Sequence, residues 1–316
     1  MRVLITGISG FAGSHLAEYL QQKSCDLFGI VSRKASRASC PYPADPSRVM
    51  ECDLGRSPAV GEIVRRVRPD IIFHLAAVTS EKASRNSPQK TYTANVLGTI
   101  HLLEGVRQAQ IDPIILIAGS SAEFGWVKQE ENPVKETNPL RPVSFYGASK
   151  VAQGMLARQY HLAHALKIVQ TVAFNYLGPR QSDRFVCSAF AKQIAQIEKG
   201  LIPPEIHVGN TETWRDFTDV RDVVKAYWLI GSEGTPGETY NICSGNPVSI
   251  RDILEKLLRL SPAKIKVTRD AFKRNQLNVP FQTGDYGKLH EQMGWRPLIS
   301  LETSLRDTLD YWRATI

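Results

Sequence analysis

The sequence lacks the features that mark membrane, secreted and metal-stapled proteins. It has no run of about 18 apolar residues, so we expect no membrane span. It opens on MRVLI, without a basic segment followed by an apolar one, so we expect no secretory signal. Its five cysteines, at 25, 40, 52, 187 and 243, are scattered and form no C-x-x-C pair. This favours reduced thiols in a cytoplasmic protein and no metal site.

The basic residues are not concentrated in one segment of the chain either. The net charge is +8, but Lys and Arg are spread along the 316 residues. Nucleic-acid binders usually gather their basic residues, so we expect no nucleic-acid partner. A phosphate-bearing ligand would suit some of this charge. The composition, 42% hydrophobic and 22% charged, is that of an ordinary globular protein.

What is present in the first half is an alternation of short apolar runs and helical patterns. The strand-like runs are RVLIT (2–6), DLFGIV (26–31), DIIFHLA (70–76), PIILIAG (113–119) and KIVQTVAFN (167–175). Continuous apolar runs favour strands that are buried on both faces, and therefore a parallel sheet. The order of elements predicts an α/β fold with a Rossmann-type doubly wound sheet.

The pattern changes after Asn175, where Pro and Gly cluster and strand-like runs become sparse. We therefore predict a cofactor-binding domain over 1–175 and a smaller mixed α/β substrate domain over 176–215 and 246–316. The stretch 216–245 contains a helical pattern and the strand-like ETYNI, and we expect it to rejoin the first domain.

Three glycines follow the first strand in TGISGFAG (6–13). Gly7 suits the tight turn into the first helix, Gly10 lets backbone N–H groups face an anion, and Gly13 lets the helix pack on the strand. This placement predicts a dinucleotide site.

The end of the second strand bears on the choice of cofactor. An NAD site usually has an acidic residue there, whereas this chain reads Ser32-Arg33-Lys34. An arginine can grip a 2′-phosphate with two parallel N–H groups. We therefore predict NADP(H), with NAD(H) as the alternative. Asp53 is either an acceptor for the adenine amino group or a simple turn residue.

The chemical centre is predicted around Tyr146 and Lys150, which share a helix face at a spacing of four. An adjacent ammonium should lower the pKa of the phenol, which can then exchange a proton with a sugar oxygen. The run IAGSSAEFG (117–125) ends nearby at a strand's carboxyl edge. In it, Ser121 is a candidate to hydrogen-bond the reacting oxygen, and Glu123 is either an acid or base or a loop cap.

Together these motifs resemble the extended short-chain dehydrogenases/reductases. The likeness rests on TGxxGxxG, Asp53-Leu54, HLAA (74–77), Ser120-Ser121 and Tyr146-x-x-x-Lys150. In the second half FNYLGPRQ (174–181), VGNTETWRDFTDVRD (208–222) and YNICSG (240–245) are similar to the GDP-sugar branch, which holds GDP-mannose 4,6-dehydratases and GDP-4-keto-6-deoxy-D-mannose reductases. The reductases are the closer likeness.

The resemblance implies roles for particular residues. The candidates for catalysis are Ser121, Glu123, Tyr146 and Lys150. The cofactor would be bound by Gly7, Gly10, Phe11, Ala12, Gly13, Arg33, Lys34, Asp53, Leu54, Leu75, Ala76 and Ala77, with Tyr146 and Lys150. A nucleoside-diphosphate sugar would be bound by Ser80, Ser121, Asn175, Arg180, Lys192, Arg215 and Arg274. Asn278 stands where the family has a glutamate for the nucleotide ribose. Helices in 95–109 and 150–165 resemble the pair that forms a four-helix homodimer.

The implied function is NADPH-dependent reduction of the C4 ketone of a nucleoside-diphosphate 4-keto-6-deoxyhexose. The specific case would be GDP-4-keto-6-deoxy-D-mannose to GDP-D-rhamnose. A GDP-mannose 4,6-dehydratase and a nucleotide-sugar 4-epimerase are alternatives, because they use the same Tyr and Lys. A non-catalytic dinucleotide sensor would be expected to lose one of these two residues, and both are present.

Overall fold

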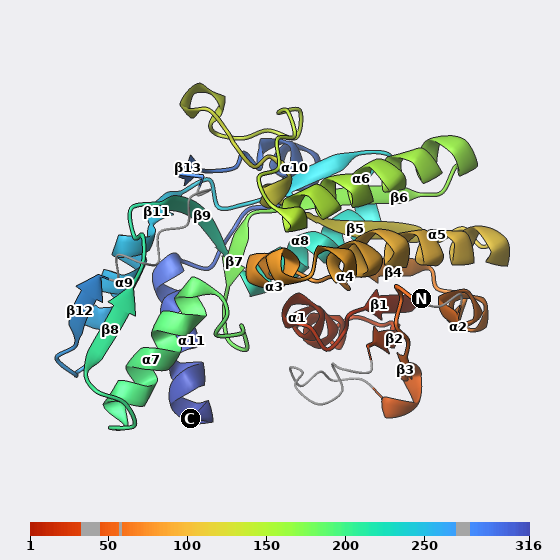
Figure 1. The fold of residues 1–316 in the computed structure, drawn as a ribbon. Coiled ribbons are helices and arrows are strands. Elements are labelled where there is room, and N and C mark those ends of the chain that lie inside the picture. Colours follow the sequence, from red (N-terminus) through yellow and green to blue (C-terminus); the bar gives the residue numbers. More distant parts are fainter. Residues whose placement is uncertain (33–44, 57–58, 270–278) are drawn as a thin grey trace.

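The main layer of the protein is a seven-stranded parallel sheet (Figure 1). The computed structural model describes residues 1–32, 45–56, 59–269 and 279–316. The strand order is β10-β6-β5-β4-β1-β2-β3. The strands are β1 (Arg2–Thr6), β2 (Asp26–Val31), β3 (Val49–Glu51), β4 (Ile71–His74), β5 (Ile114–Ser120), β6 (Ile168–Ala173) and β10 (Thr239–Ile242). The chain runs outward from β1 to β3 and then continues on the other side of β1, so its direction reverses between β1 and β4. The predicted Rossmann-type sheet is confirmed.

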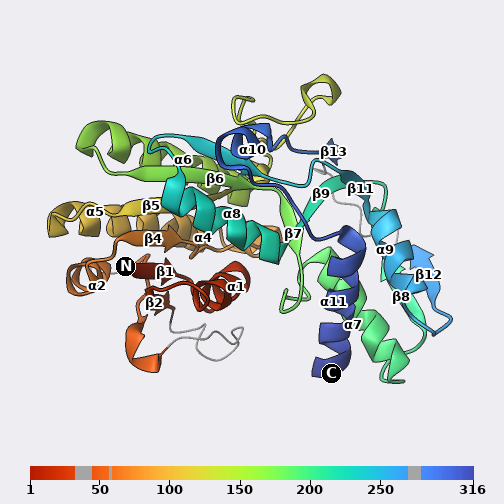
Figure 2. The same ribbon diagram turned by 180° about the vertical axis from the view of Figure 1, so that it is seen from behind.

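Helices cover both faces of this sheet, as Figures 1 and 2 show. α1 (Phe11–Leu20) packs beside α8 (Val220–Glu233) on one face. The other face carries α2 (Ala59–Val67), α5 (Gly98–Ala109) and α6 (Phe145–His164). Between β4 and α5 the chain forms α3 (Glu81–Asn86), α4 (Pro88–Tyr92) and a π-helical stretch, Thr93–Leu97.

Alternate side chains of the strands explain why the apolar runs are continuous. Val3 and Ile5 of β1 lie in the core under α1 and α8, whereas Leu4 between them lies in the core under α2 and α5. All three are fully buried. A strand that is buried on both faces needs apolar residues at every position rather than at every second one.

The smaller part of the molecule carries short strands and three packed helices, at the left of Figure 1. One sheet contains β7 (Asn175–Leu177), β9 (Trp214–Asp219), β11 (Pro247–Ser249) and β13 (Phe281–Gln282), and a second pairs β8 (Glu205–Val208) with β12 (Lys266–Arg269). The helices are α7 (Val186–Glu198), α9 (Ile250–Arg259) and α11 (Leu301–Thr315). The expectation of sparse strands after Asn175 was wrong. These strands have two to six residues each, and such short segments leave no apolar run.

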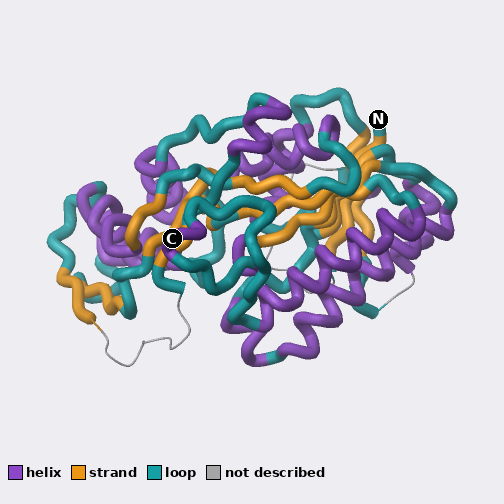
Figure 3. Tube along the Cα trace, turned by 90° about the horizontal axis from the view of Figure 1, so that it is seen from above, coloured by secondary structure: helices purple, strands orange, loops and turns teal. Residues whose placement is uncertain are grey.

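Residues 216–245 connect the two parts. β9 belongs to a sheet of the smaller part, while α8 packs on the main sheet and β10 pairs with β6 at its edge. Later in the chain, α10 (Gly287–Met293) returns to pack against β10. Figure 3 shows the resulting elongated shape, with the long sheet and its helices at one end and the smaller part at the other.

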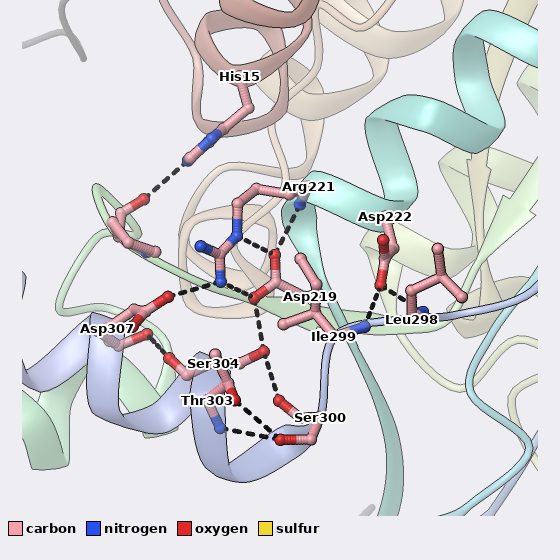
Figure 4. A network of polar contacts seen from close by, with 12 residues as sticks. His15, Asp219, Arg221, Asp222, Leu298, Ile299, Ser300, Thr303, Ser304 and Asp307 are labelled. Carbon is pink, nitrogen blue, oxygen red and sulfur yellow. Dashed lines mark hydrogen bonds and ion pairs between the residues drawn. The ribbon is translucent and has the colours of Figure 1, made fainter.

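A buried polar network holds α11 at the start of α8 (Figure 4). The Asp219 carboxylate accepts from the backbone N of Arg221 at 2.8 Å, from the Arg221 guanidinium and from the Ser304 hydroxyl of α11. Arg221 also pairs with Asp307 of α11 at 2.7 Å. One turn later, Asp222 accepts from two backbone N–H groups, those of Leu298 and Ile299. These contacts fix the smaller part relative to the main sheet, because both carboxylates are buried and each accepts several hydrogen bonds.

No helix in the described ranges is long and apolar enough to cross a membrane.

Candidate active site

The glycine-rich turn between β1 and α1 is shaped for a close backbone approach. Gly7 has a φ of +73°, and a Cβ there would lie 2.9 Å from the Cα of Ala76. A Cβ on Gly13 would lie 2.2 Å from the carbonyl oxygen of Gly7. Gly10 is exposed and precedes α1 without a side-chain cap. The first N–H groups of α1 therefore have no side-chain cap and are available to an anion at the helix N-terminus.

The residues predicted to line the rest of the cofactor site lie around this turn. Thr6 at the end of β1 receives hydrogen bonds from the backbone N of Leu75 and of Ala76, at 3.2 Å each, so the segment 75–77 runs beside β1. Ala12 is buried in α1, and Phe11 stacks on Tyr176 with ring centroids 5.7 Å apart.

On the adenine side of the site, the described side chains offer fewer ligand contacts than the sequence predicted. The Asp53 carboxylate is half-exposed and accepts from Gly55 N at 3.1 Å, so it shapes a turn and still faces outward. The Leu54 side chain is buried in the core under α2 and α5, which leaves its backbone as the part that can reach a ligand. Arg33 and Lys34 lie outside the described residues.

Tyr146 lies in the first turn of α6, beside the end of β5. Ser144 caps this helix by accepting from Gly147 N at 3.0 Å. The phenol hydrogen-bonds the side chain of Ser120, the last residue of β5. Burial raises the pKa of Tyr146 above its usual value, and the bond to Ser120 opposes this. The expected lowering of the pKa was therefore wrong: the phenol is neutral and suited to donate a proton.

Ser120, which sequence reasoning passed over within the Ser120-Ser121 doublet, is the serine that meets Tyr146. Ser121 opens a 3₁₀ turn, Ser121–Glu123, and is buried. Its backbone oxygen accepts from Gln282 Nε2 at 3.1 Å, so it anchors β13. The available signal was the strand pattern, since the last residue of β5 lies at the carboxyl edge where such sites form.

Lys150 is buried on α6, one turn after Tyr146. Its Nζ donates to Ala118 O at 2.7 Å and to Gln153 Oε1 at 2.8 Å. Burial lowers the pKa of Lys150 to about 8, and Glu123 opposes the decrease. Two of the three ammonium N–H groups are thus used within the protein.

A buried polar chain continues from Lys150 to the cofactor turn. Gln153 Nε2 donates to the Thr99 hydroxyl at 2.7 Å, and His74 Nε2 lies 2.9 Å from the same hydroxyl. The other imidazole nitrogen of His74 lies 2.8 Å from the hydroxyl of Thr6. Burial lowers the pKa of His74 to about 3, so this imidazole is neutral.

Glu123 ends the 3₁₀ turn and points into the protein. It is 5% exposed, and its Oε1 accepts from Ser120 N at 2.8 Å. Burial raises the pKa of Glu123 to about 7, while Ser120 N and Lys150 oppose the increase. Its carboxylate lies against Gly119 of β5 and Gly154 of α6.

The predicted sugar-nucleotide residues come from both parts of the molecule. Ser80 caps α3 by accepting from Ala83 N at 3.3 Å, and Asn175 Nδ2 donates to Asp216 O at 3.2 Å. On β9, burial lowers the pKa of Arg215, and the charge of Glu81 in α3 opposes this decrease. Glu81 of α3 and Arg215 of β9 are thus close enough to interact electrostatically. Arg274 and Asn278 lie outside the described residues.

Two predicted substrate cations are already paired within the chain. Lys192 on α7 bonds Asp183 at 2.6 Å and lies 5.1 Å from the Trp312 ring centroid. Arg180, whose φ is +73°, binds Glu18 at 2.5 Å and His15 at 2.7 Å. The structure therefore places Arg180 against α1, where it fastens the 178–181 turn to the cofactor-binding helix.

Metal ligation finds no support in the part of the chain that the structure describes. There, no three His, Cys, Asp or Glu side chains come together as a candidate metal site. The described cysteines 25, 52, 187 and 243 are free thiols.

Comparison with known proteins places these features in a family. Residues 4–308 match the model of the family described as GDP-mannose 4,6 dehydratase. A GDP-6-deoxy-D-mannose reductase from Pseudomonas aeruginosa is 30% identical over 315 residues, which are 100% of this chain and 98% of that protein.

Solved structures give the same result for the fold. RMD from Pseudomonas aeruginosa, complexed with NADPH, superposes with a TM-score of 0.86 at 30% identity, over 100% of this chain and 99% of that one. UDP-glucose 4-epimerase from Thermus thermophilus, in complex with NAD, gives 0.87 at 27% identity, with both chains covered completely. Proteins of this fold thus include some bound to NADPH and some bound to NAD.

Proposed function

Because this chain belongs to the GDP-mannose 4,6-dehydratase family, whose members are nucleotide-sugar-modifying short-chain dehydrogenases/reductases, we propose that it is an NADPH-dependent 4-ketoreductase. The substrate would be a nucleoside-diphosphate 4-keto-6-deoxyhexose. The specific reaction would convert GDP-4-keto-6-deoxy-D-mannose to GDP-D-rhamnose, in line with the reductase relative.

The observation that carries the proposal is the pairing of a neutral Tyr146 with Ser120, while Glu123 is turned inward. Reduction of a ketone needs one proton donor at the oxygen, and the phenol supplies it while Ser120 holds the same oxygen. Dehydration of GDP-mannose also needs a base at C5 and an acid at the C6 hydroxyl. A carboxylate that is 5% exposed and bonded to Ser120 N is poorly placed for either task.

The residues present fit a dinucleotide. The tight turn at Gly7 and Gly13 and the exposed helix start at Gly10 would hold the pyrophosphate. The third N–H of Lys150 would bind the nicotinamide ribose. When bound, NADPH supplies the hydride that reaches C4.

The protein's own residues would complete the reduction. As the C4–O π bond breaks and a C–H bond forms at C4, Tyr146 gives its proton to the O4 alkoxide. The charge of Lys150 stabilises the phenolate that remains, until solvent returns a proton. Arg215 would meet the diphosphate, since a partly buried guanidinium on β9 favours an anionic ligand. Ser80 and Asn175 would contact the sugar.

Each of the two alternative functions is supported by one specific observation. The family model is that of a dehydratase, and Glu123 lies two positions after Ser121. The likeness to a UDP-glucose 4-epimerase favours a reaction with no net redox change.

We also propose a homodimer formed by α5 and α6, which lie side by side on one face of the sheet (Figure 1). Phe145, Met155 and Leu162 of α6 are large apolar residues that are 49%, 55% and 67% exposed. Exposed apolar side chains on α6, beside α5, suit burial against a second copy of the chain.

A product analysis tests the reductase against these alternatives. The purified protein is incubated with GDP-4-keto-6-deoxy-D-mannose and NADPH, and separately with GDP-mannose without added reductant. We expect the first mixture to yield a product with two more hydrogen atoms, with one NADPH consumed for each product molecule. Rapid loss of water from GDP-mannose would establish the dehydratase instead.

A further inference from the structure

We propose that Glu123 is a positioning residue that keeps Lys150 charged from behind the site, without contact with the sugar. This inference rests on the roles proposed above for Tyr146 and Lys150. It assigns a task to a buried carboxylate that hydride and proton transfer do not themselves require.

The space that holds the carboxylate is left open by two glycines. A Cβ on Gly119 of β5 would lie 2.5 Å from Glu123 Oε1, and a Cβ on Gly154 of α6 would lie 3.8 Å from Oε2. Glu123 therefore lies between the strand that carries Ser120 and the helix that carries Lys150. Burial of a carboxylate is costly unless it is hydrogen-bonded and near an opposite charge, and this space provides both.

The two opposite charges are fixed to backbone atoms on either side of Gly119. Lys150 Nζ donates to Ala118 O at 2.7 Å, and Glu123 Oε1 accepts from Ser120 N at 2.8 Å. Both charged groups are therefore held by the end of β5 and cannot move apart without breaking these bonds. An anion held in this way favours the charged form of the nearby amine.

Other ionisable groups around the pair do not supply this negative charge. His74 of β4 is a neutral imidazole, and the charge of Lys150 itself helps to lower the pKa of His74. Tyr146 of α6 is neutral because burial raises its pKa. Glu81 of α3 acts on Tyr146 and Arg215, and it is not among the groups that shift the pKa of Lys150.

The chain from Lys150 to Thr6 orders the lysine but cannot carry its proton away. The Thr99 hydroxyl donates its one proton to Asn95 O at 2.7 Å, so it accepts from Gln153 and from His74. A hydroxyl that accepts on both sides interrupts a proton relay. The charge of Lys150 is therefore governed by Glu123 and by burial.

The test removes the negative charge of Glu123 and keeps the shape of its side chain. In Glu123→Gln the amide oxygen can still accept from Ser120 N, but the negative charge is gone. We expect the pKa of Lys150 to fall by about one unit or more. The free protein is titrated by NMR with ¹³Cε-labelled lysine, and the Lys150 signal is assigned by its loss in Lys150→Met.

Glu131→Gln is the matched control. Glu131 also accepts a backbone N–H at an N-cap, that of Lys128 at 2.8 Å, and it pairs with Arg141. It acts on a different cation, so its replacement should leave the pKa of Lys150 unchanged. Glu123→Asp keeps the negative charge on a shorter side chain. Its Lys150 pKa should therefore lie between that of Glu123→Gln and that of the wild type.

The pH dependence of turnover supplies a second readout. Loss of the Lys150 charge removes the stabilisation of the phenolate, so the alkaline decline of kcat should begin at lower pH in Glu123→Gln. Because burial raises the pKa of Glu123 to about 7, this residue is protonated in the wild type below about pH 6, and the two proteins should then have similar rates.

These outcomes separate the two proposals. An unchanged Lys150 pKa in folded Glu123→Gln, or an equal loss of rate at every pH, would overturn the role of Glu123. A shifted Lys150 pKa in a protein that reduces no 4-keto sugar would support the role of Glu123 and count against the ketoreductase.

Discussion

Ser120 and Ser121 are neighbours in sequence with different surroundings. The Ser120 side chain hydrogen-bonds the phenol of Tyr146 at the carboxyl end of β5, whereas Ser121 is buried and bonds β13 through its backbone oxygen. Motif spacing located the doublet, but it could not say which hydroxyl faces the ligand. That depends on where β5 ends and the 3₁₀ turn begins.

A pair of alanine substitutions distinguishes the two serines. Ser120→Ala removes a hydrogen bond to the reacting oxygen and to Tyr146, and a net bond of this kind contributes roughly 1 kcal/mol. We expect kcat to fall about tenfold, as measured by NADPH oxidation with the 4-keto substrate. Ser121→Ala, the control, should stay within about twofold of the wild type. A larger loss in Ser121→Ala than in Ser120→Ala would return the role to Ser121.

Glu123 and Arg180 show a second limit of sequence reasoning at the residue scale. The motif run around residue 120 marked Glu123 and the family resemblance marked Arg180 as site residues, yet the Glu123 carboxylate lies inside the protein and Arg180 is paired with α1. A charged residue near a motif can serve the ligand or the protein itself. Burial and partners decide between these, and neither can be read from one sequence.

At the scale of elements, the sequence predicted most strands of the main sheet. The first two strands have the predicted bounds, because buried apolar runs flanked by turn residues define them sharply. The short strands of the smaller part were missed because their pairing depends on distant segments, as in β9 with β7, β11 and β13. The glycine turn was recognisable because its backbone geometry admits few other residues.

The residues that follow β2 lead to a prediction about cofactor choice. The chain reads Ser32-Arg33-Lys34 there with no acidic residue. If Arg33 binds the 2′-phosphate, Arg33→Ala loses charge-assisted hydrogen bonds of about 1.5–3 kcal/mol. We expect KM for NADPH to rise roughly 10- to 100-fold, with KM for NADH little changed.

Arg66→Ala, which removes an exposed arginine from α2, is the control for general charge effects. Steady-state kinetics measure KM for NADPH and for NADH in the wild type and in both variants. Equal losses with NADPH and NADH in Arg33→Ala would rule out recognition of the 2′-phosphate by this residue.

At the scale of the whole molecule, the site depends on how the smaller part meets the carboxyl edge of the main sheet. Figure 4 shows the contacts of Asp219, Arg221 and Asp222 that hold α11 against α8. Because these contacts order the two parts, Arg215 of β9 lies close enough to Glu81 of α3 for that carboxylate to oppose the lowering of the Arg215 pKa. Composition predicted a change of organisation after Asn175, but it could not predict this relative placement, which arises from buried pairs far apart in sequence.

The central claim is that the protein catalyses a net hydride transfer from NADPH to C4 of a 4-keto-6-deoxy sugar nucleotide. The most direct measurement supplies NADPH with deuterium at the transferred position and locates the label in the product by NMR and mass spectrometry. A ketoreductase yields one deuterium at C4 for each NADPH consumed. An epimerase or dehydratase keeps its hydride within the substrate, so a rearranged or dehydrated product without deuterium, with NADPH unconsumed, would contradict the account.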